Sequence, residues 1–499
     1  MADSTLVPAG GATRDAMHVA IVGAGVTGLA TAYLLRRRGV RVTVFEASPH
    51  EGGLAGSFHR DGFYFDFGPH ELCTANPELI ALVRETCGDD LIEVEKHIAH
   101  HFLGRYVKYP FEIVDMLRNI GPGLSARAVA EVAWCRLKNL LRRPADDSFE
   151  SWTNARFGPT LYGVYFGPYT RKVWGIDPAL LDPRTASQRV TIDSVWDLVK
   201  KTLAYHWLGT EDFKHAHSEL HRRFFYLRRG AGTLQSHLRR RAEELGATFR
   251  FGKSLAGIER DADHVRALRF ADGEVARGFD YVVSTIPLSQ LVTLALPQRA
   301  EGLLRESSLP FRGMAFVFLR VNRPKVLDFH WVYYSGPAIP FQRMTEFGHF
   351  GAEMSPPGTT GLALEISCVP GDGTWEASDT EIAERSIAGL EALGVLRRSE
   401  LIGYDVVRQR YAYPIQVQGF IEKAHDLLSA LSEVTNLVTI GRQGLFRYCN
   451  MNECLEMAID IVPELTSGKR SIRYMEDGSW LGVALTDRYV TRSAPAVSS

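Results

Sequence analysis

The sequence predicts an α/β fold in which one parallel-sheet domain is assembled from three separated pieces of the chain. The first observation is a strand–turn–helix–strand pattern over 18–46, with three glycines in its turn. The second is that apolar, strand-like runs return at 279–287 and 436–441. The third is that the intervening stretches differ, because 73–223 has mainly helical spacing whereas 296–431 is rich in strand-like runs. A domain interrupted by two insertions accounts for all three observations.

Residues 18–46 contain the most specific motif in the chain. An apolar run over 19–22 ends in the turn GAGVTG, a helical pattern follows, and a second apolar run ends in Glu46. In such a turn the glycines permit the sharp bend, let the backbone approach a pyrophosphate, and let helix and strand pack closely. The N–H groups at the helix start would bind phosphates, and Glu46 would accept hydrogen bonds from ribose. The motif predicts a Rossmann-type dinucleotide site formed by Gly23, Gly25, Val26, Thr27, Gly28 and Glu46.

The other elements follow in chain order. In the cofactor domain, a helix is predicted over 232–245, strands at 247–251, 264–271, 279–287 and 436–441, and a helix over 451–461. In the first insertion, helices are predicted over 125–143, 161–174 and 193–207. In the second, strands are predicted at 314–321, 330–334, 361–368 and 401–408, and a helix near 420–431. The predicted domains are a disordered leader (1–15), the cofactor domain (16–72, 224–295 and 432–465), the two insertions (73–223 and 296–431) and a C-terminal extension (466–499).

Composition narrows the class of protein. The chain has 499 residues and a formal net charge of −1, so no overall field favours nucleic acid. A basic and aromatic stretch, 222–229, is interpreted as a strand rather than a nucleic-acid site. The six cysteines form no CxxC pair and no zinc-type spacing, which predicts reduced thiols in a cytoplasmic protein without a metal. No apolar run approaches the roughly 18 residues of a membrane span, and the first 15 residues do not resemble a signal peptide.

Three further segments accompany the glycine turn. Gly52-Gly53-Leu54 forms a second glycine turn soon after Glu46, and a strand-like run over 63–67 leads into Gly68-Pro69-His70. Near the C-terminus, Gly441-Arg442 follows a strand, and Asn450-Met451 begins a helix whose N-terminus would stabilise negative charge.

These segments resemble the FAD-dependent amine oxidase and protoporphyrinogen oxidase-like superfamily, over about 17–465. The resemblance implies noncovalent FAD. The residues expected at this cofactor are Gly23, Gly25, Val26, Thr27, Gly28, Glu46, Gly53, Leu54, Pro69, His70, Gly441, Arg442, Asn450 and Met451.

A narrower resemblance is to the UDP-galactopyranose mutases, carried by Gly68-Pro69-His70, by PYTRKVWG at 168–175, by Tyr413-Pro414-Ile415 and by GRQGLFRY at 441–448. The match departs at Cys73, Val173 and Asn450. The resemblance implies that His70 and Arg442 act beside a flavin whose reduced form is active. It also implies that a nucleotide sugar contacts Tyr169, Thr170, Trp174, Tyr413, Arg447 and Tyr448.

The residues alone leave other interpretations open. His70 could be a loop histidine bonded to backbone, Trp174 could belong to the core, and Arg442 could cap a strand. Tyrosine is common in protein cores, so Tyr413 and Tyr448 could also be core residues.

Taken together, the motifs predict an enzyme that interconverts the pyranose and furanose forms of a nucleotide sugar at reduced FAD, without net redox. The alternative is an FAD-dependent oxidoreductase acting on an amine, a porphyrinogen-like ring or a polyene. A flavin-binding protein without catalysis is a third option. The expected partner is a small-molecule substrate, and an external reductant of the flavin, NAD(P)H included, is left open.

Overall fold

The structure is a computed structural model of the chain, and it describes residues 17–109, 119, 121–141, 147–189 and 223–467. The predicted leader, the predicted helix over 193–207 and all but the first two residues of the predicted C-terminal extension lie outside the described residues.

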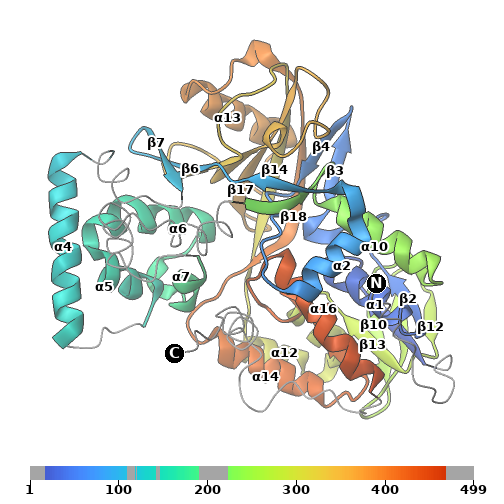
Figure 1. The fold of residues 1–499 in the computed structure, drawn as a ribbon. Coiled ribbons are helices and arrows are strands. Elements are labelled where there is room, and N and C mark those ends of the chain that lie inside the picture. The colour runs from blue at the N-terminus through green and yellow to red at the C-terminus, as the bar shows by residue number, and fades with distance from the viewer. Residues whose placement is uncertain (1–16, 110–118, 120, 142–146, 190–222, 468–499) are drawn as a thin grey trace, which may run out of the picture.

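The predicted parallel sheet is present and has five strands in the order β19-β13-β1-β2-β9. It draws on all three predicted pieces of the chain, which confirms the α/β fold class. The strands are β1 (His18–Val22), β2 (Arg41–Phe45), β9 (Thr248–Arg250), β13 (Tyr281–Ser284) and β19 (Leu437–Thr439). In Figure 1 this sheet lies at the lower right, beside α1 (Val26–Arg36), α10 (Gly232–Glu244) and α16 (Met451–Thr466).

Helix α1 is the centre of this domain. Nine of its residues are buried, and it packs against both α10 and α16. A Cβ atom at Gly28 would lie against the carbonyl group of Gly23, so the close approach of helix and turn requires glycine there. The prediction for this glycine is therefore confirmed in its packing role.

A second sheet has seven strands in the order β18-β14-β17-β16-β15-β6-β7 and lies in the upper part of Figure 1. Its strands are β6 (Ile98–Phe102), β7 (Arg105–Tyr109), β14 (Phe311–Val321), β15 (Trp331–Tyr334), β16 (Arg343–Glu346), β17 (Thr360–Cys368) and β18 (Leu401–Pro414). Helix α13 (Asp379–Ala392) packs against β14 and β18.

Two of these strands were not predicted, because they lie in 73–223, for which only helices were expected. β6 runs parallel to β15, from Ile98 beside Trp331 to His101 beside Tyr334, and β7 pairs with β6. All five residues of β6 are buried, two of them histidines. Its sequence therefore lacks the alternation of apolar and polar residues by which a half-exposed strand is recognised.

The helical part of the first insertion lies at the left of Figure 1. It contains α4 (Pro122–Leu141), α5 (Phe149–Leu161), a π-helical turn (Tyr162–Phe166), α6 (Gly167–Trp174) and α7 (Arg184–Arg189). The predicted helices over 125–143 and 161–174 are thus present within the described residues. Gly175 ends α6 in the left-handed conformation, with φ of 65°.

The remaining elements are smaller or connect these parts. The helices are α2 (Pro77–Cys87), α11 (Leu288–Ala295), α12 (Pro297–Glu306), α14 (Phe420–Ser432) and α15 (Gly441–Gly444). Short 3-10 turns cover 53–55, 88–90, 178–180, 347–349 and 398–400. The strands are β3 (Ser57–Arg60), β4 (Phe63–Asp66), β5 (Leu91–Glu95), β8 (Arg223–Leu227), β10 (Leu255–Arg260), β11 (Val265–Phe270) and β12 (Val275–Arg277). None of the described helices is both long enough and apolar enough to cross a membrane.

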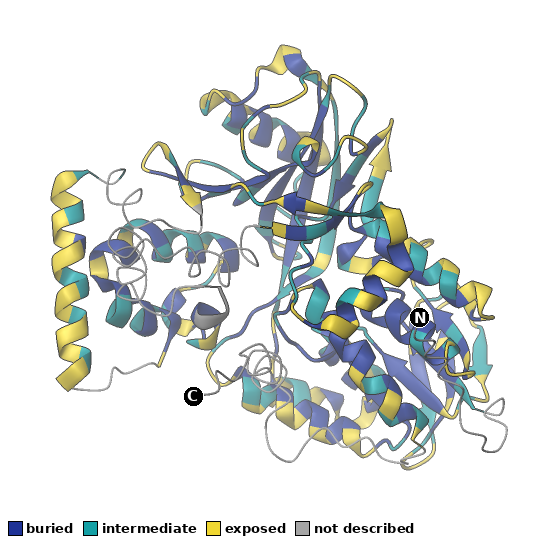
Figure 2. Cartoon of the chain, in the orientation of Figure 1, coloured by how far each residue is buried: buried dark blue, intermediate teal, exposed yellow. Residues whose placement is uncertain are grey.

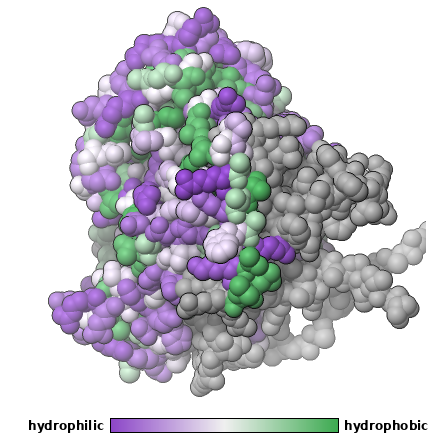
Figure 3. All heavy atoms as spheres, turned by 90° about the vertical axis from the view of Figure 1, so that its left-hand side faces the viewer, coloured by the Kyte–Doolittle hydropathy of each residue, from purple (hydrophilic) through white to green (hydrophobic). Residues whose placement is uncertain are grey.

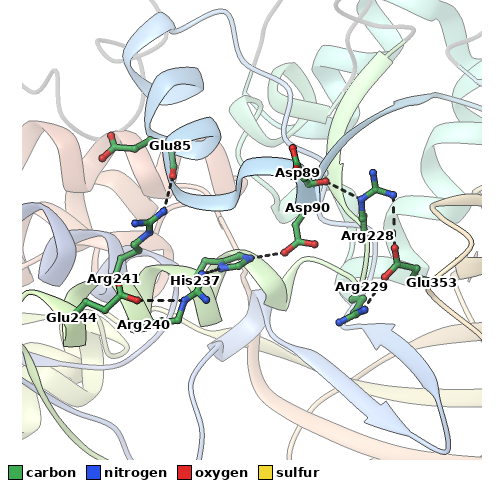
Figure 4. Close-up of polar contacts among 10 residues, drawn as sticks. All are labelled: Glu85, Asp89, Asp90, Arg228, Arg229, His237, Arg240, Arg241, Glu244 and Glu353. Carbon is green, nitrogen blue, oxygen red and sulfur yellow. Dashed lines mark hydrogen bonds and ion pairs between the residues drawn. The ribbon is translucent and has the colours of Figure 1, made fainter.

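Strand β8 (Arg223–Leu227) lies in the basic and aromatic stretch, as interpreted from the sequence, and the described arginines of this stretch, Arg223, Arg228 and Arg229, pair with acids. Arg229 donates to Glu353 over 3.0 Å, and Arg228 donates to the backbone carbonyl of Asp89 over 2.8 Å. Figure 4 shows that these contacts continue into α10, where His237 bonds to Asp90 over 2.7 Å. The network ties three parts of the chain together, and each exposed pair contributes about 0–1 kcal/mol.

Candidate functional site

A cavity of about 490 Å³ lies at the carboxyl ends of β1, β2, β13 and β19, between the parallel sheet and the seven-stranded sheet. This is the edge at which open α/β sheets bind ligands. The lining residues come from the turns and helix starts that follow these strands, from the loop after β4, and from β15, β16 and β18: Gly23, Gly25, Val26, Thr27, Glu46, Ala47, Gly52, Gly53, Leu54, Ala55, Pro69, His70, Glu71, Thr285, Ile286, Pro287, Trp331, Tyr333, Arg343, Gln409, Arg410, Tyr411, Gly441, Arg442, Gln443, Tyr448, Cys449, Asn450, Met451 and Cys454.

Three glycine turns meet at one side of this cavity. Gly25 and Gly52 form a bridge between two of them, and a Cβ atom at Gly53 would come within 3.3 Å of the Gly25 Cα. The third turn contains Gly441, with φ of 86°, where a Cβ would approach the Thr27 hydroxyl to 3.1 Å. Nothing lies within 4 Å of a Cβ built on Gly25, so open space adjoins its backbone. The arrangement leaves backbone accessible to an extended phosphate-bearing ligand.

Glu46 lies at the cavity where β2 ends. Its carboxylate accepts a hydrogen bond from the Ala24 N–H over 2.7 Å and another from the Ser48 N–H over 2.8 Å. The side chain therefore ties the end of β2 to the first glycine turn. Both bonds hold an acceptor group beside the cavity, where the sequence predicts the ribose.

His70 follows the Gly68-Pro69 turn and also lines the cavity. Its Nε2 atom is buried, and it makes no hydrogen bond within the described part of the chain. Burial, together with the nearby Arg343 and Arg442 guanidinium groups, lowers the pKa of His70 to about 4. The imidazole is therefore neutral near pH 7 and offers one unsatisfied ring nitrogen to a bound group.

Acidification should destabilise the folded protein through His70. The folded-state pKa of about 4 lies below the ordinary value of 6.5, so the unfolded chain binds more protons between these pH values. The resulting stability is present above pH 6.5 and is lost as the pH falls toward 4, by up to about 3 kcal/mol. We expect His70→Gln to lose less stability over this range than the unmodified protein. Urea unfolding near pH 7 and near pH 4.5 measures the difference, and an equal loss in both proteins would contradict it.

Arg442 is held rigidly beside the same cavity. Its guanidinium donates to the carbonyl of Cys449 over 2.7 Å and to that of Ala412 over 3.1 Å. The same group lies 4.9 Å from the ring centre of Tyr413 and 4.8 Å from that of Tyr448. Two carbonyls and two aromatic rings thus fix a positive charge at the cavity wall.

Asn450 and Met451 also lie at the cavity, where α16 begins. The Asn450 N–H donates to Glu453 over 2.8 Å, which caps the helix. The predicted helix N-terminus is therefore present at this position, with its positive dipole end at the cavity.

The predicted substrate residues are only partly brought to this cavity. Tyr448 lines it, whereas the other five do not: Tyr169, Thr170, Trp174, Tyr413 and Arg447. Trp174 is 1% exposed and lies behind the tyrosines, with ring centres 5.9 Å from Tyr413 and 6.0 Å from Tyr448. The Tyr169 ring packs against Tyr333, which lines the cavity, with the two ring centres 5.6 Å apart. Helix α6 therefore forms a layer beneath the cavity wall.

Several lining residues were not anticipated from the sequence. Arg343 makes two hydrogen bonds to Glu365, at 2.5 and 2.7 Å, and Glu365 is 1% exposed. Gly68 packs against this pair, because a Cβ there would lie 2.8 Å from the guanidinium. One signal was available, since Glu365 interrupts the apolar run of β17. A carboxylate at such a position requires a buried partner.

Two cysteines also lie at the cavity. The sulfur atoms of Cys449 and Cys454 are 3.7 Å apart, and neither residue is in a disulfide. Within the described ranges, no group of three or more histidines, cysteines and acids could hold a metal ion.

The fold is similar to that of solved structures. The structure of reduced UDP-galactopyranose mutase superposes with a TM-score of 0.76 over 90% of this chain and 94% of that one, at 20% identity. A putative protoporphyrinogen oxidase from Exiguobacterium sp. 255-15 gives a TM-score of 0.66 over 91% and 99%, at 18% identity. At these identities the likeness describes the fold.

Sequence comparison gives relatives with oxidase names. The mitochondrial protoporphyrinogen oxidase of Nicotiana tabacum is 29% identical over 198 residues, which are 38% of this chain and 37% of that protein. The L-amino-acid oxidase of Trimeresurus stejnegeri is 27% identical over 269 residues, or 51% and 47%. Each match thus spans less than half of the relative's own length. The family of flavin containing amine oxidoreductases matches residues 26–412. Because this match covers most of the chain, the protein belongs to the flavin-containing amine oxidoreductase family, whose cofactor is a flavin.

Proposed function

We propose that the cavity binds FAD noncovalently and that the enzyme interconverts the ring forms of a nucleotide sugar. The three glycine turns, the start of α1 and Glu46 suit the pyrophosphate and ribose of FAD, because they offer backbone N–H groups and an acceptor at the same side of the cavity. The residues proposed to hold FAD are Gly23, Gly25, Val26, Thr27, Glu46, Gly53, Leu54, Pro69, His70, Gly441, Arg442, Asn450 and Met451, with Gly28 supporting them from within α1.

The observation that carries the ring-isomerisation proposal is the environment of Arg442. A guanidinium fixed by two carbonyls and flanked by Tyr413 and Tyr448 suits an anionic diphosphate, with aromatic surface beside it for a nucleoside. Arg343 and Arg410 line the same cavity, and the Arg343 charge is balanced by buried Glu365. A cavity wall with these cationic groups suits an anionic ligand better than a purely apolar one.

When bound in its reduced form, FAD would supply a nucleophile for the anomeric carbon without net electron transfer. The chain's own residues would position the substrate and stabilise the charge that develops on it. Arg442 would hold negative charge at the cavity wall, and the N-terminus of α16 would add a positive dipole end. Neutral His70 would offer its Nε2 atom to one hydrogen bond. Tyr448 would contact the diphosphate, while Trp174 would support Tyr448 from below.

The second candidate is an FAD-dependent oxidoreductase. It is favoured by the names of the sequence relatives, which include protoporphyrinogen oxidases and L-amino-acid oxidases. A 4,4′-diapophytoene desaturase of Staphylococcus haemolyticus is also 40% identical over 89 residues, or 17% of each chain. Part of the cavity wall is compatible with such substrates, since Ile286, Pro287 and Trp331 line it. An amine, a porphyrinogen-like ring or a polyene would then be the substrate.

A single assay distinguishes the two candidates. The purified chain is incubated with a panel of nucleotide sugars, with and without dithionite, and ring isomers and peroxide are measured. We expect isomers only after reduction, with no reductant consumed per turnover, and FAD in the supernatant after acid precipitation. Stoichiometric peroxide from an amine, porphyrinogen or polyene substrate would favour the oxidoreductase. A colourless protein that cannot be reconstituted with FAD would overturn both candidates.

A further inference from the structure

Helix α4 stands at the edge of the molecule and packs through one face only. That face contacts α5, where Asn139 donates to the Ala155 carbonyl over 2.8 Å and Cys135 donates to the Asn154 carbonyl over 3.4 Å. Ala128 is buried between the two helices. Figure 2 shows the rest of α4 exposed along its length.

The outward face of α4 is apolar. Its large side chains are 51 to 83% exposed, and with 3.6 residues per turn they share an arc of about 140° with three exposed alanines. The large residues are Val129, Trp134, Leu137, Leu140 and Leu141, and the alanines are Ala126, Ala130 and Ala133. Figure 3 looks onto this side of the molecule, where hydrophobic residues reach the surface. We call these eight residues the α4 apolar face.

Basic residues border the α4 apolar face on both sides. By the same helical spacing, Arg136 lies at one edge, and Arg127 and Lys138 lie at the other. Glu131 is the one acid of α4. It accepts from the Thr160 N–H of α5 over 2.7 Å and also pairs with Arg127 over 2.8 Å, so Arg136 and Lys138 carry the positive charge at the two edges. The outward side of the helix therefore combines exposed aliphatic groups, a tryptophan and positive charge.

This combination of residues favours one kind of binding partner. A helix with an apolar face, a tryptophan and cationic edges suits the interface of a bilayer with anionic head groups. A second copy of the chain fits less well, because a two-fold contact would place these cationic edges against each other. The described helices also include none that could span a membrane. We propose that α4 docks the protein on an anionic lipid surface, with the α4 apolar face in the interface and Arg136 and Lys138 at the head groups.

The test is flotation of the full-length, flavin-loaded protein with vesicles. Vesicles of phosphatidylcholine alone are compared with vesicles containing phosphatidylglycerol, at low and high salt. We expect binding to the anionic vesicles that weakens with salt. The double variant Leu137→Glu/Leu140→Glu and the double variant Arg136→Glu/Lys138→Glu should each bind on the order of tenfold more weakly.

The control is Ile402→Glu, which places a glutamate at an apolar residue on β18 that is about as exposed as Leu137. It should float like the unmodified protein, and the flavin absorbance of every variant should be unchanged because all these positions are exposed. Absence of flotation, or equal loss in Ile402→Glu, would overturn the proposal. So would a concentration-dependent dimer that Leu137→Glu/Leu140→Glu dissociates, in a protein that does not bind vesicles. That result would assign the α4 apolar face to a second copy of the chain.

Discussion

Replacing Arg442 with alanine is expected to lower turnover by about 100-fold or more in a protein that still folds and retains its flavin. The guanidinium is fixed by the carbonyls of Ala412 and Cys449 at the cavity wall, so it can stabilise negative charge without reorganising. Its loss should also make the flavin harder to reduce. The measurements are turnover, flavin midpoint potential and melting temperature. Arg442→Lys should recover only part of the function, because an ammonium cannot reproduce the planar guanidinium between two rings.

Arg408 offers a matched control for this variant. It lies on the same strand as Tyr413, donates to two backbone carbonyls, those of Trp375 and Ala377, and does not line the cavity. Arg408→Ala should therefore lower the melting temperature with little change in the midpoint potential. If Arg442→Ala behaves in the same way, with normal turnover, Arg442 has a structural role only.

Glu365→Ala is expected to destabilise the protein by about 3–5 kcal/mol, because Glu365 is the buried partner of the cavity residue Arg343. The Glu365 carboxylate is 1% exposed and makes two hydrogen bonds to Arg343, so its removal leaves a guanidinium without its counter-charge in a largely buried position. Urea unfolding near neutral pH measures the effect. Flavin content should fall as well, because Arg343 lines the cavity.

The double variant Arg343→Leu/Glu365→Leu distinguishes the contribution of the ion pair to stability from that of the packing around it. Because it removes both charges together, it should cost less free energy of unfolding than Glu365→Ala alone. A loss below about 1 kcal/mol in Glu365→Ala would mean that water satisfies the guanidinium, and would contradict the prediction.

Much of the fold could be predicted because its local patterns agree with its tertiary environment. The glycines at Gly23 indicate a turn, the apolar runs beside it indicate buried strands, and the spacing of apolar residues in α1 indicates a helix. Strands β6 and β16 were missed for the opposite reason. They are four or five residues long, and β6 is buried throughout, so partner strands rather than alternation decide that they are strands.

Some residues of the candidate site could likewise be predicted from the sequence, and others could not. Gly25, Glu46, Gly53 and Gly441 were predicted together and do line one cavity, since the carboxyl ends of parallel strands share one edge. Arg343 and Glu365 could not, because their pairing joins strands β16 and β17 through a register that neither sequence reveals. The position of Trp174 behind Tyr448, outside the cavity lining, likewise depends on how α6 packs beneath it.

The sequence by itself determined the fold class, the glycine turns and the family resemblance, because each is recognised from short segments that carry their own local pattern. Only the tertiary structure decided which side chains share the cavity, that Arg442 lies between Tyr413 and Tyr448, and that α4 leaves an apolar face uncovered. The physical reason is that the periodicity of a helix or a strand is set by residues close together in the sequence. Contacts between distant segments are selected by the packing of the whole molecule, in which many weak interactions must be satisfied together.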